Sequence, residues 1–170
     1  MSEHPERVAR AAERGDAFEP HEDGFAVTTV ELDAVVRPEG VDPTTFAVTV
    51  SAPRLSAVVE GEAVAEVVED GWFETFDRRL DGVDSALAAD HDLAPAATLA
   101  GEELLVTATF ADADVERGFA DAKALVEYVE GTYVQGAVPG YEYGEPLATL
   151  RGRARENARG GAGGPGASGR

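Results

Sequence analysis

The side chains of this chain that could do chemistry are mostly carboxylates, and the most suggestive group is DADVERGFADAK at residues 112–123. It begins like the loop of an EF-hand, which needs glycine at its sixth position and a bidentate glutamate at its twelfth. Arg117 and Lys123 occupy those two positions here. We therefore interpret the stretch as the start of a helix, where acidic side chains favour the positive end of the helix dipole.

The three histidines, His4, His21 and His91, lie far apart in the sequence and in polar or loop-like contexts. A metal site built from them and from carboxylates would have no recognisable ligand spacing, so we expect all three side chains on the surface. Pairs of acids such as Glu127 with Glu130 say little in so acidic a chain, because a charge run is usually a solvated face. The sequence therefore predicts no catalytic residue, no metal and no cofactor.

One glycine motif also fails as a nucleotide site. GAGGPG at 161–166 matches G-x-G-x-x-G formally, but such a loop needs a strand before it, a helix after it and an acid about 20 residues further on. With Arg170 as the last residue, we expect no room for that helix and acid. The sequence also lacks a Walker loop and a Gly-x-Ser-x-Gly nucleophile elbow.

The charge balance indicates the solvent in which the protein works. Of its 170 residues, 33 are acidic and 14 are basic, the formal net charge is −19, and Lys123 is the only lysine. Such a charge repels itself in dilute buffer, whereas in molar salt the Debye length falls to about 3 Å. The composition is typical of proteins from the cytoplasm of a halophilic archaeon. The alternative is an ordinary acidic protein of a bacterium.

Targeting and redox signals favour a cytoplasmic location. The N-terminal sequence MSEHPERVAR lacks the apolar stretch of a signal peptide, and no run approaches the roughly 18 apolar residues of a membrane span. The chain has no cysteine, which excludes a disulfide framework and a thiolate metal site. We therefore expect a cytoplasmic protein that does not contact membranes.

Hydrophobic periodicity predicts the elements that must position any site. In chain order they are helix 4–14, strands 24–36 and 46–53, helix 56–80, a weak strand ending near 99, strand 104–110 and helix 114–133. The apolar residues change face within strand 24–36, which predicts a bulge or twist near Thr29. This helix-hairpin-helix-hairpin-helix order predicts an α+β fold, with an antiparallel sheet of about four strands and helices packed on one face. The order is similar to that of the type III secretion chaperone-like fold, an analogy that carries no function.

The composition changes at Arg151. Residues 1–150 are expected to form a single α+β domain, and residues 151–170 an Arg/Gly-rich flexible tail with a short helix at its start, because the tail has no large apolar residue to bury. Its five arginines could contact phosphate. However, the tail has no aromatic residue for base stacking and the body is strongly acidic, so we do not expect nucleic acid as a partner.

Two stretches carry a family resemblance, VEDGWFETFDRRL at 68–80 and VEYVEGTYVQGAVPGYEYGEP at 126–146. With the acidic, lysine-poor composition, they resemble an uncharacterised haloarchaeal family of small acidic proteins of unknown function. The resemblance extends over about residues 5–150. It implies no activity, cofactor or catalytic residue.

The second of these stretches holds three of the four tyrosines of the chain. They could pack over the helix or sheet with their hydroxyl groups wet. Alternatively, they could line a shallow groove for a partner, since aromatic residues with few charges suit an interface core. The candidate partner-binding residues are Trp72, Tyr133, Gln135, Tyr141 and Tyr143.

Two functions remain open from the sequence. The first is a non-enzymatic protein-interaction or chaperone-like module that binds another protein or itself. It follows from the missing catalytic constellation and from the aromatic, glycine-rich loop. The alternative is a small-molecule binder or carboxylate-based enzyme, which requires a concave pocket with convergent acids.

Overall fold

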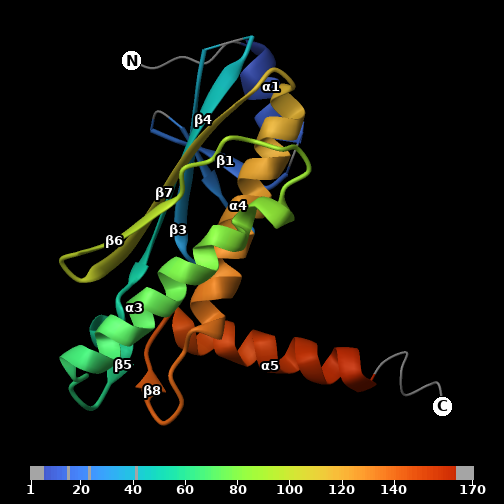
Figure 1. Ribbon diagram of the computed structural model, residues 1–170. Helices are drawn as coiled ribbons and strands as arrows, with labels where there is room; N and C mark the ends of the chain where they lie inside the picture. The colour runs from blue at the N-terminus through green and yellow to red at the C-terminus, as the bar shows by residue number, and fades with distance from the viewer. Residues whose placement is uncertain (1–5, 15, 23, 41, 164–170) are drawn as a thin grey trace.

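The computed structural model describes residues 6–14, 16–22, 24–40 and 42–163 (Figure 1). The helices are α1 (Glu6–Arg14), α2 (Leu55–Val58), α3 (Glu66–Leu80), the 3-10 helix η1 (Asp81–Ala86), α4 (Val115–Gln135) and α5 (Leu147–Gly163). The strands are β1 (Phe18–His21), β2 (Gly24–Val27), β3 (Asp33–Glu39), β4 (Thr44–Pro53), β5 (Val59–Glu60), β6 (Ala96–Ala100), β7 (Glu103–Asp112) and β8 (Glu142–Tyr143).

The main sheet has six antiparallel strands in the order β1-β2-β3-β4-β7-β6. The expected α+β class is confirmed, but the expected count of about four strands is wrong. Residues 24–36, predicted as one strand, form β2 and β3 with a bend between them. Within this bend the backbone N–H groups of Glu31 and Leu32 donate hydrogen bonds to the Glu130 carboxylate of α4. β1, which was not predicted, pairs with β2.

Burial alternates along the central strands, so the sheet has two different faces. β4 and β7 pair over their whole length, from Thr44 with Asp112 to Pro53 with Glu103. Helices α1, α3 and α4 lie on one side of the sheet (Figure 1). The buried apolar side chains of β3, β4 and β7 that form this inner face are Ala34, Val36, Phe46, Val48, Val50, Ala52, Leu104, Val106, Ala108 and Phe110.

Helix α4 supplies most of the cover. Its predicted N-cap is confirmed, because the Asp114 side chain accepts a hydrogen bond from the Arg117 N–H. Gly118 lies directly on the ring of Phe46, at a point where a Cβ atom would overlap that ring. Phe46 also stacks on Phe110 and meets Phe119 edge to face, with 5.2 Å between ring centroids in each pair. The centre of the core is therefore an aromatic cluster closed by a glycine.

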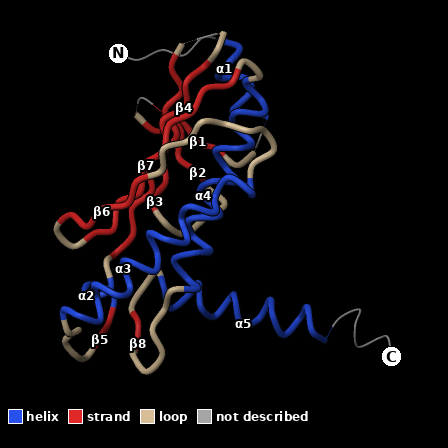
Figure 2. Tube along the Cα trace, viewed as in Figure 1, coloured by secondary structure: helices blue, strands red, loops and turns tan. Residues whose placement is uncertain are grey.

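The predicted helix over 56–80 is only partly right. The chain forms the short helix α2 and the strand β5 first, and the helix proper is α3, which continues through Gly71. β5 pairs with β8 in a second, two-stranded sheet, which lies with α2 at the end of α3 (Figure 2). Val58 accepts a hydrogen bond from the Gly144 N–H next to this pair, so this end of the protein is held by chain segments far apart in sequence.

Helix α5 is longer than the short helix predicted there, and it projects from the body (Figures 1 and 2). Leu147 and Leu150 bury its first turn. Arg153 pairs with Glu31 at 2.9 Å, and the Arg151 guanidinium lies 5.1 Å from the Tyr143 ring centroid. The start of the basic segment therefore contacts the acidic body. The division into a domain and a flexible tail stays a prediction.

Candidate functional site

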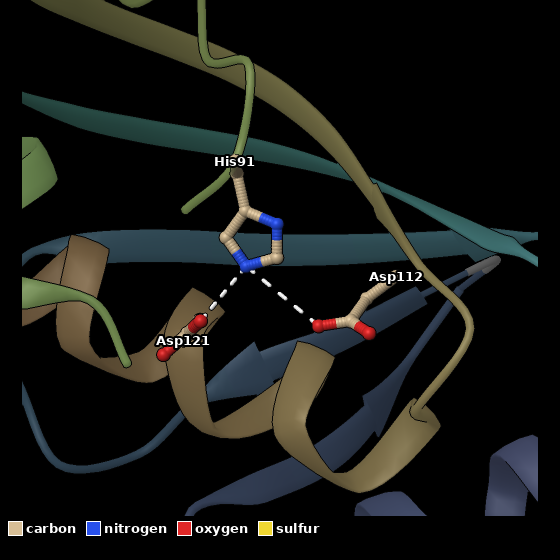
Figure 3. A group of neighbouring side chains, drawn as sticks. All are labelled: His91, Asp112 and Asp121. Carbon is tan, nitrogen blue, oxygen red and sulfur yellow. Dashed lines mark hydrogen bonds and ion pairs between the residues drawn. The ribbon is translucent and has the colours of Figure 1, made fainter. Parts of the chain in front are cut away.

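His91 is not a surface residue as the sequence analysis predicted. Its side chain is only 5% exposed and lies between the buried carboxylates of Asp112 and Asp121 (Figure 3). Asp112 ends β7, Asp121 lies in the second turn of α4, and His91 comes from the segment between η1 and β6. The imidazole ring also packs on Phe110, with 4.4 Å between centroids. His21 is exposed, as predicted, and His4 lies outside the described residues.

Hydrogen bonds hold the Asp121 side of this cluster. The Asp121 carboxylate accepts from the N–H groups of Ala88 and Ala89, at 2.8 and 3.1 Å, and from His91 Nε2 at 2.8 Å. Because Nε2 faces only carboxylate oxygens, it must carry a hydrogen. Asp121 thus fixes the segment before β6 onto α4.

Asp112 completes the cluster from the other side. Its Oδ2 lies 3.7 Å from His91 Nε2, and its two oxygens accept bonds from the Arg117 guanidinium at 2.8 and 2.9 Å. The N–H of Asp114 donates to it as well. The hydrogen bonds from Arg117 lower the pKa of the Asp112 carboxyl below its ordinary value and outweigh the effect of burial.

The three side chains could in principle ligate a metal. His91, Asp112 and Asp121 offer one nitrogen and two oxygens within 4.8 Å of one another, and imidazole with carboxylate suits zinc and similar ions. However, the Arg117 guanidinium already donates to both oxygens of Asp112, and its positive charge would repel a cation bound there. We therefore interpret the cluster as a charged hydrogen-bond bridge between β7, α4 and the segment before β6.

A sequence signal for this cluster existed. Asp112 continues the alternation of Leu104 and Phe110, so it had to point into the core as they do. Asp121 lies four residues before the buried Leu125 on α4, which places it on the buried stripe. Two acids on buried faces require a partner, and His91 was available.

The predicted aromatic residues do not all meet in one groove. Tyr133 is 1% exposed, and its hydroxyl donates to the carbonyl of Pro53 at 2.8 Å. The Tyr143 side chain is also buried, and its hydroxyl bonds both the N–H and the carbonyl of Val138. Burial raises the pKa of both phenols. Tyr143 therefore packs the loop that follows α4, whereas Tyr133 links α4 to the end of β4.

Of the other predicted residues, Trp72 is buried and Gln135 is exposed. Trp72 and Gln135 line a shallow pocket of about 450 Å³, together with Val138 and Pro139. Trp72 meets Tyr133 at a centroid distance of 6.4 Å. Tyr141 is half-buried against Tyr143. Partner binding by this set stays a prediction.

A deeper groove lies at the end of the sheet where β3, β4 and β7 meet the start of α5. Its volume is about 460 Å³. Leu32, Ala52, Pro53, Ala57 and Pro146 give it apolar walls, and five acids surround it: Glu31, Asp33, Glu102, Glu103 and Glu145. The groove therefore has both apolar surface and strong negative charge.

The outer face of the sheet has the opposite character. We use the term outer face for the side chains of β4, β7 and β6 that alternate with the buried ones. Those on β6 are exposed, those on β7 are exposed except for Leu105, and those on β4 are half-buried. The outer face comprises Thr45, Ala47, Thr49, Ser51, Pro53, Glu103, Leu105, Thr107, Thr109, Ala111, Ala96, Thr98 and Ala100. Its single charged side chain is Glu103, at one end of β7.

Comparison with known proteins gives one match, which extends over residues 13–153 and is described as a family of unknown function (DUF5813). The chain belongs to this family. The expected resemblance to an uncharacterised family is thus confirmed, while the haloarchaeal origin stays a prediction. The chain matches no curated protein and no solved structure.

The DUF5813 match includes the features described above. The His91 cluster, the acidic groove and the outer face all fall within residues 13–153, whereas most of α5 falls outside. Within the described part of the chain, no helix has the length and apolar character needed to cross a bilayer. The DUF5813 description assigns no activity, so a function must be argued from the surfaces themselves.

Proposed function

We propose that this DUF5813 protein is a protein-interaction module that takes its partner on the outer face of the sheet. The observation that carries the proposal is the scarcity of charge there. Charged residues make up 28% of the chain, so a surface of thirteen residues with ordinary composition would hold about four of them, whereas the outer face holds only Glu103, at its margin. A face so poor in charge, on a protein of net charge −19, resembles the core of an interface, from which charged residues are depleted.

The size of the outer face fits the centre of such an interface. Three strands spaced about 4.8 Å apart, over about seven residues at 3.3 Å each, give an area of about 330 Å². A standard interface buries about 800 Å² on each partner. Charged residues of the neighbouring strand ends, Asp33, Glu39 and Glu103, would then form the polar rim.

The chemistry of the outer face favours a flat, uncharged partner surface. Its threonine hydroxyls can donate and accept hydrogen bonds, and the alanines between them allow close approach. An uncharged contact also keeps its strength in molar salt, where pairing between exposed charges is screened. The proposal is therefore compatible with the halophilic setting predicted from the composition.

Affinity capture in molar KCl tests the proposal, with three forms of the full chain as bait. Thr109→Glu places a carboxylate at the centre of the outer face, and Ala120→Glu places one on the exposed side of α4 as the matched control. We expect the wild type and Ala120→Glu to retain the same stoichiometric protein. Thr109→Glu should lose most of it while keeping the circular dichroism spectrum of the wild type. Equal retention by all three baits, or by none, would overturn the proposal.

The acidic groove supports a second candidate, a binding site for a small cationic ligand. Five carboxylates above apolar walls in about 460 Å³ match a ligand with amines separated by methylene groups. Glu31 belongs to this groove, and Glu130 behind it has its pKa raised by burial. Calorimetric titration with spermidine separates the candidates. Binding that is lost in Glu103→Gln and kept in Thr109→Glu would favour the groove.

A further inference from the structure

The two edges of the main sheet are built differently. β1 is four residues long and contains Pro20, which has no N–H to offer to a further strand. β6 forms the opposite edge, with β7 on one side and no other described strand on its free side. Figure 1 shows β6 at the margin of the sheet, away from α1 and α4. Natural proteins usually protect such an edge with charged residues, proline or a bulge.

β6 has little of the usual protection. Its sequence, AATLA at 96–100, contains no charge and no proline, and Pro95 directly precedes it. Ala97 and Leu99 point to the inner face and are only half-buried, whereas Ala96, Thr98 and Ala100 are exposed. The apolar inner face of the sheet therefore ends at β6 with side chains that are only half-buried. The backbone N–H and C=O groups on the free side of β6 can pair with another strand.

We propose that a second copy of this chain adds its own β6 to this edge. The strands would run antiparallel about a two-fold axis at Thr98, giving an isologous dimer with one continuous twelve-stranded sheet. This register alone lets all five residues of each β6 find a partner. Thr98 lies opposite Thr98 of the second copy, and Ala97 lies opposite its Leu99. Threonine pairs and apolar pairs at such positions stabilise antiparallel sheets.

The charges next to β6 determine whether a second copy can approach this edge without electrostatic repulsion. The chain is strongly acidic, and Glu102 and Glu103 follow β6 directly. However, the chain turns back after Ala100, and Glu103 lies on β7 opposite Ala100, so neither acid continues the line of β6 toward the second copy. The residues that pair in the proposed register, 96–100 of each copy, are all uncharged. Like charges directly opposite would destabilise the pair, and this arrangement avoids them. Two acidic molecules can therefore meet at the one edge where neither carries charge.

The dimer does not depend on the partner proposed for the outer face. Thr109, the residue that probes the outer face, lies on β7 beyond the end of the β6–β7 pairing. A dimer through β6 would leave that position open on both copies. The two proposals can therefore fail separately.

Cysteine cross-linking gives the direct test, because the chain has no cysteine of its own. Opposed residues of antiparallel strands have Cβ atoms about 4.5–5.5 Å apart, and a disulfide needs about 3.5–4.5 Å, so a small adjustment closes the bond. We expect Thr98→Cys to form a covalent dimer under mild oxidation in molar KCl. Thr109→Cys, on the same face, should stay monomeric. Equal cross-linking of the two variants would overturn the proposed register.

Light scattering after gel filtration measures the dimer without modification. The wild type and Thr109→Glu should both show twice the monomer mass. Thr98→Glu should raise the dissociation constant by about fivefold, measured at the lowest salt at which the circular dichroism spectrum is kept. A wild type of monomer mass at high protein concentration would refute the dimer. A monomer that still captures a partner through Thr109 would leave the proposed function intact.

Discussion

Replacing one buried oxygen acceptor should destabilise the protein far more than the size of the change suggests. In Asp121→Asn the side chain keeps its shape, but an amide group now faces donors at Ala89 and His91. One oxygen can still serve Ala88. Leaving a buried donor without its acceptor costs about 1–3 kcal/mol. Two donors, those of Ala89 and His91, lose their acceptor together, so we expect a loss at the upper end, about 3 kcal/mol.

Urea unfolding in molar KCl, followed by the fluorescence of the single tryptophan, Trp72, measures this loss. With a slope of about 2 kcal/mol per molar urea, the midpoint should fall by about 1.5 M. Asp92→Asn is the matched control, because Asp92 lies in the same segment and is exposed, and its effect should stay within about 0.5 kcal/mol. If the two variants unfold at the same urea concentration, the bridge around His91 does not stabilise the fold.

Two further predictions concern Arg117 and Gly118. Arg117 lowers the Asp112 pKa, so its contribution is present above the ordinary aspartate range near 3.8 and is lost as the pH falls through the lowered pKa. Arg117→Ala should thus be less stable than the wild type at neutral pH, with a gap that narrows in acid; a constant gap in urea unfolding would contradict this. Gly118→Ala should cost about 2 kcal/mol by overpacking against Phe46. Gly131 has open space around it, so Gly131→Ala should raise the free energy of unfolding by up to about 1 kcal/mol. If urea unfolding shows that both glycine variants are stabilised, or both destabilised, the reasoning is refuted.

The sequence predicted the elements whose burial pattern is uninterrupted. In β4 and β7 every second residue is buried, and in α4 buried residues recur three or four positions apart. These periods identify strands and helices from sequence, and Asp114 is a common N-cap residue. The change of face within residues 24–36 predicted a bulge or twist near Thr29, but not the complete break between β2 and β3. Within that break the Glu31 N–H donates to Glu130, about 100 residues away. A local pattern contains no information about such a contact.

The candidate sites were less predictable for the same reason. His91 has polar neighbours in sequence, and only the folded chain brings it against Asp112 and Asp121. The packing alternative for the tyrosines expected their hydroxyl groups to be wet. Tyr133 and Tyr143 are instead buried with their hydroxyls bonded to backbone groups, and sequence alone does not show which carbonyl a hydroxyl reaches. The alternating pattern of β4 and β7 indicates a half-exposed face. The extent of its charge-poor surface becomes visible only when the strand order places β6, β7 and β4 side by side.

The pairing of β4 with β7 has a consequence for how the protein folds. Pro53 meets Glu103 at one end of this pair and Thr44 meets Asp112 at the other, so the whole segment 54–102 must be placed before the centre of the sheet closes. Contacts between distant parts of a chain slow folding, because loop closure comes before the gain from pairing. Before β7 pairs with it, β4 is an unpaired edge strand rich in threonine and valine. The period just after synthesis is therefore when this chain is most exposed to aggregation, and the β3–β4 hairpin is the segment that would start it.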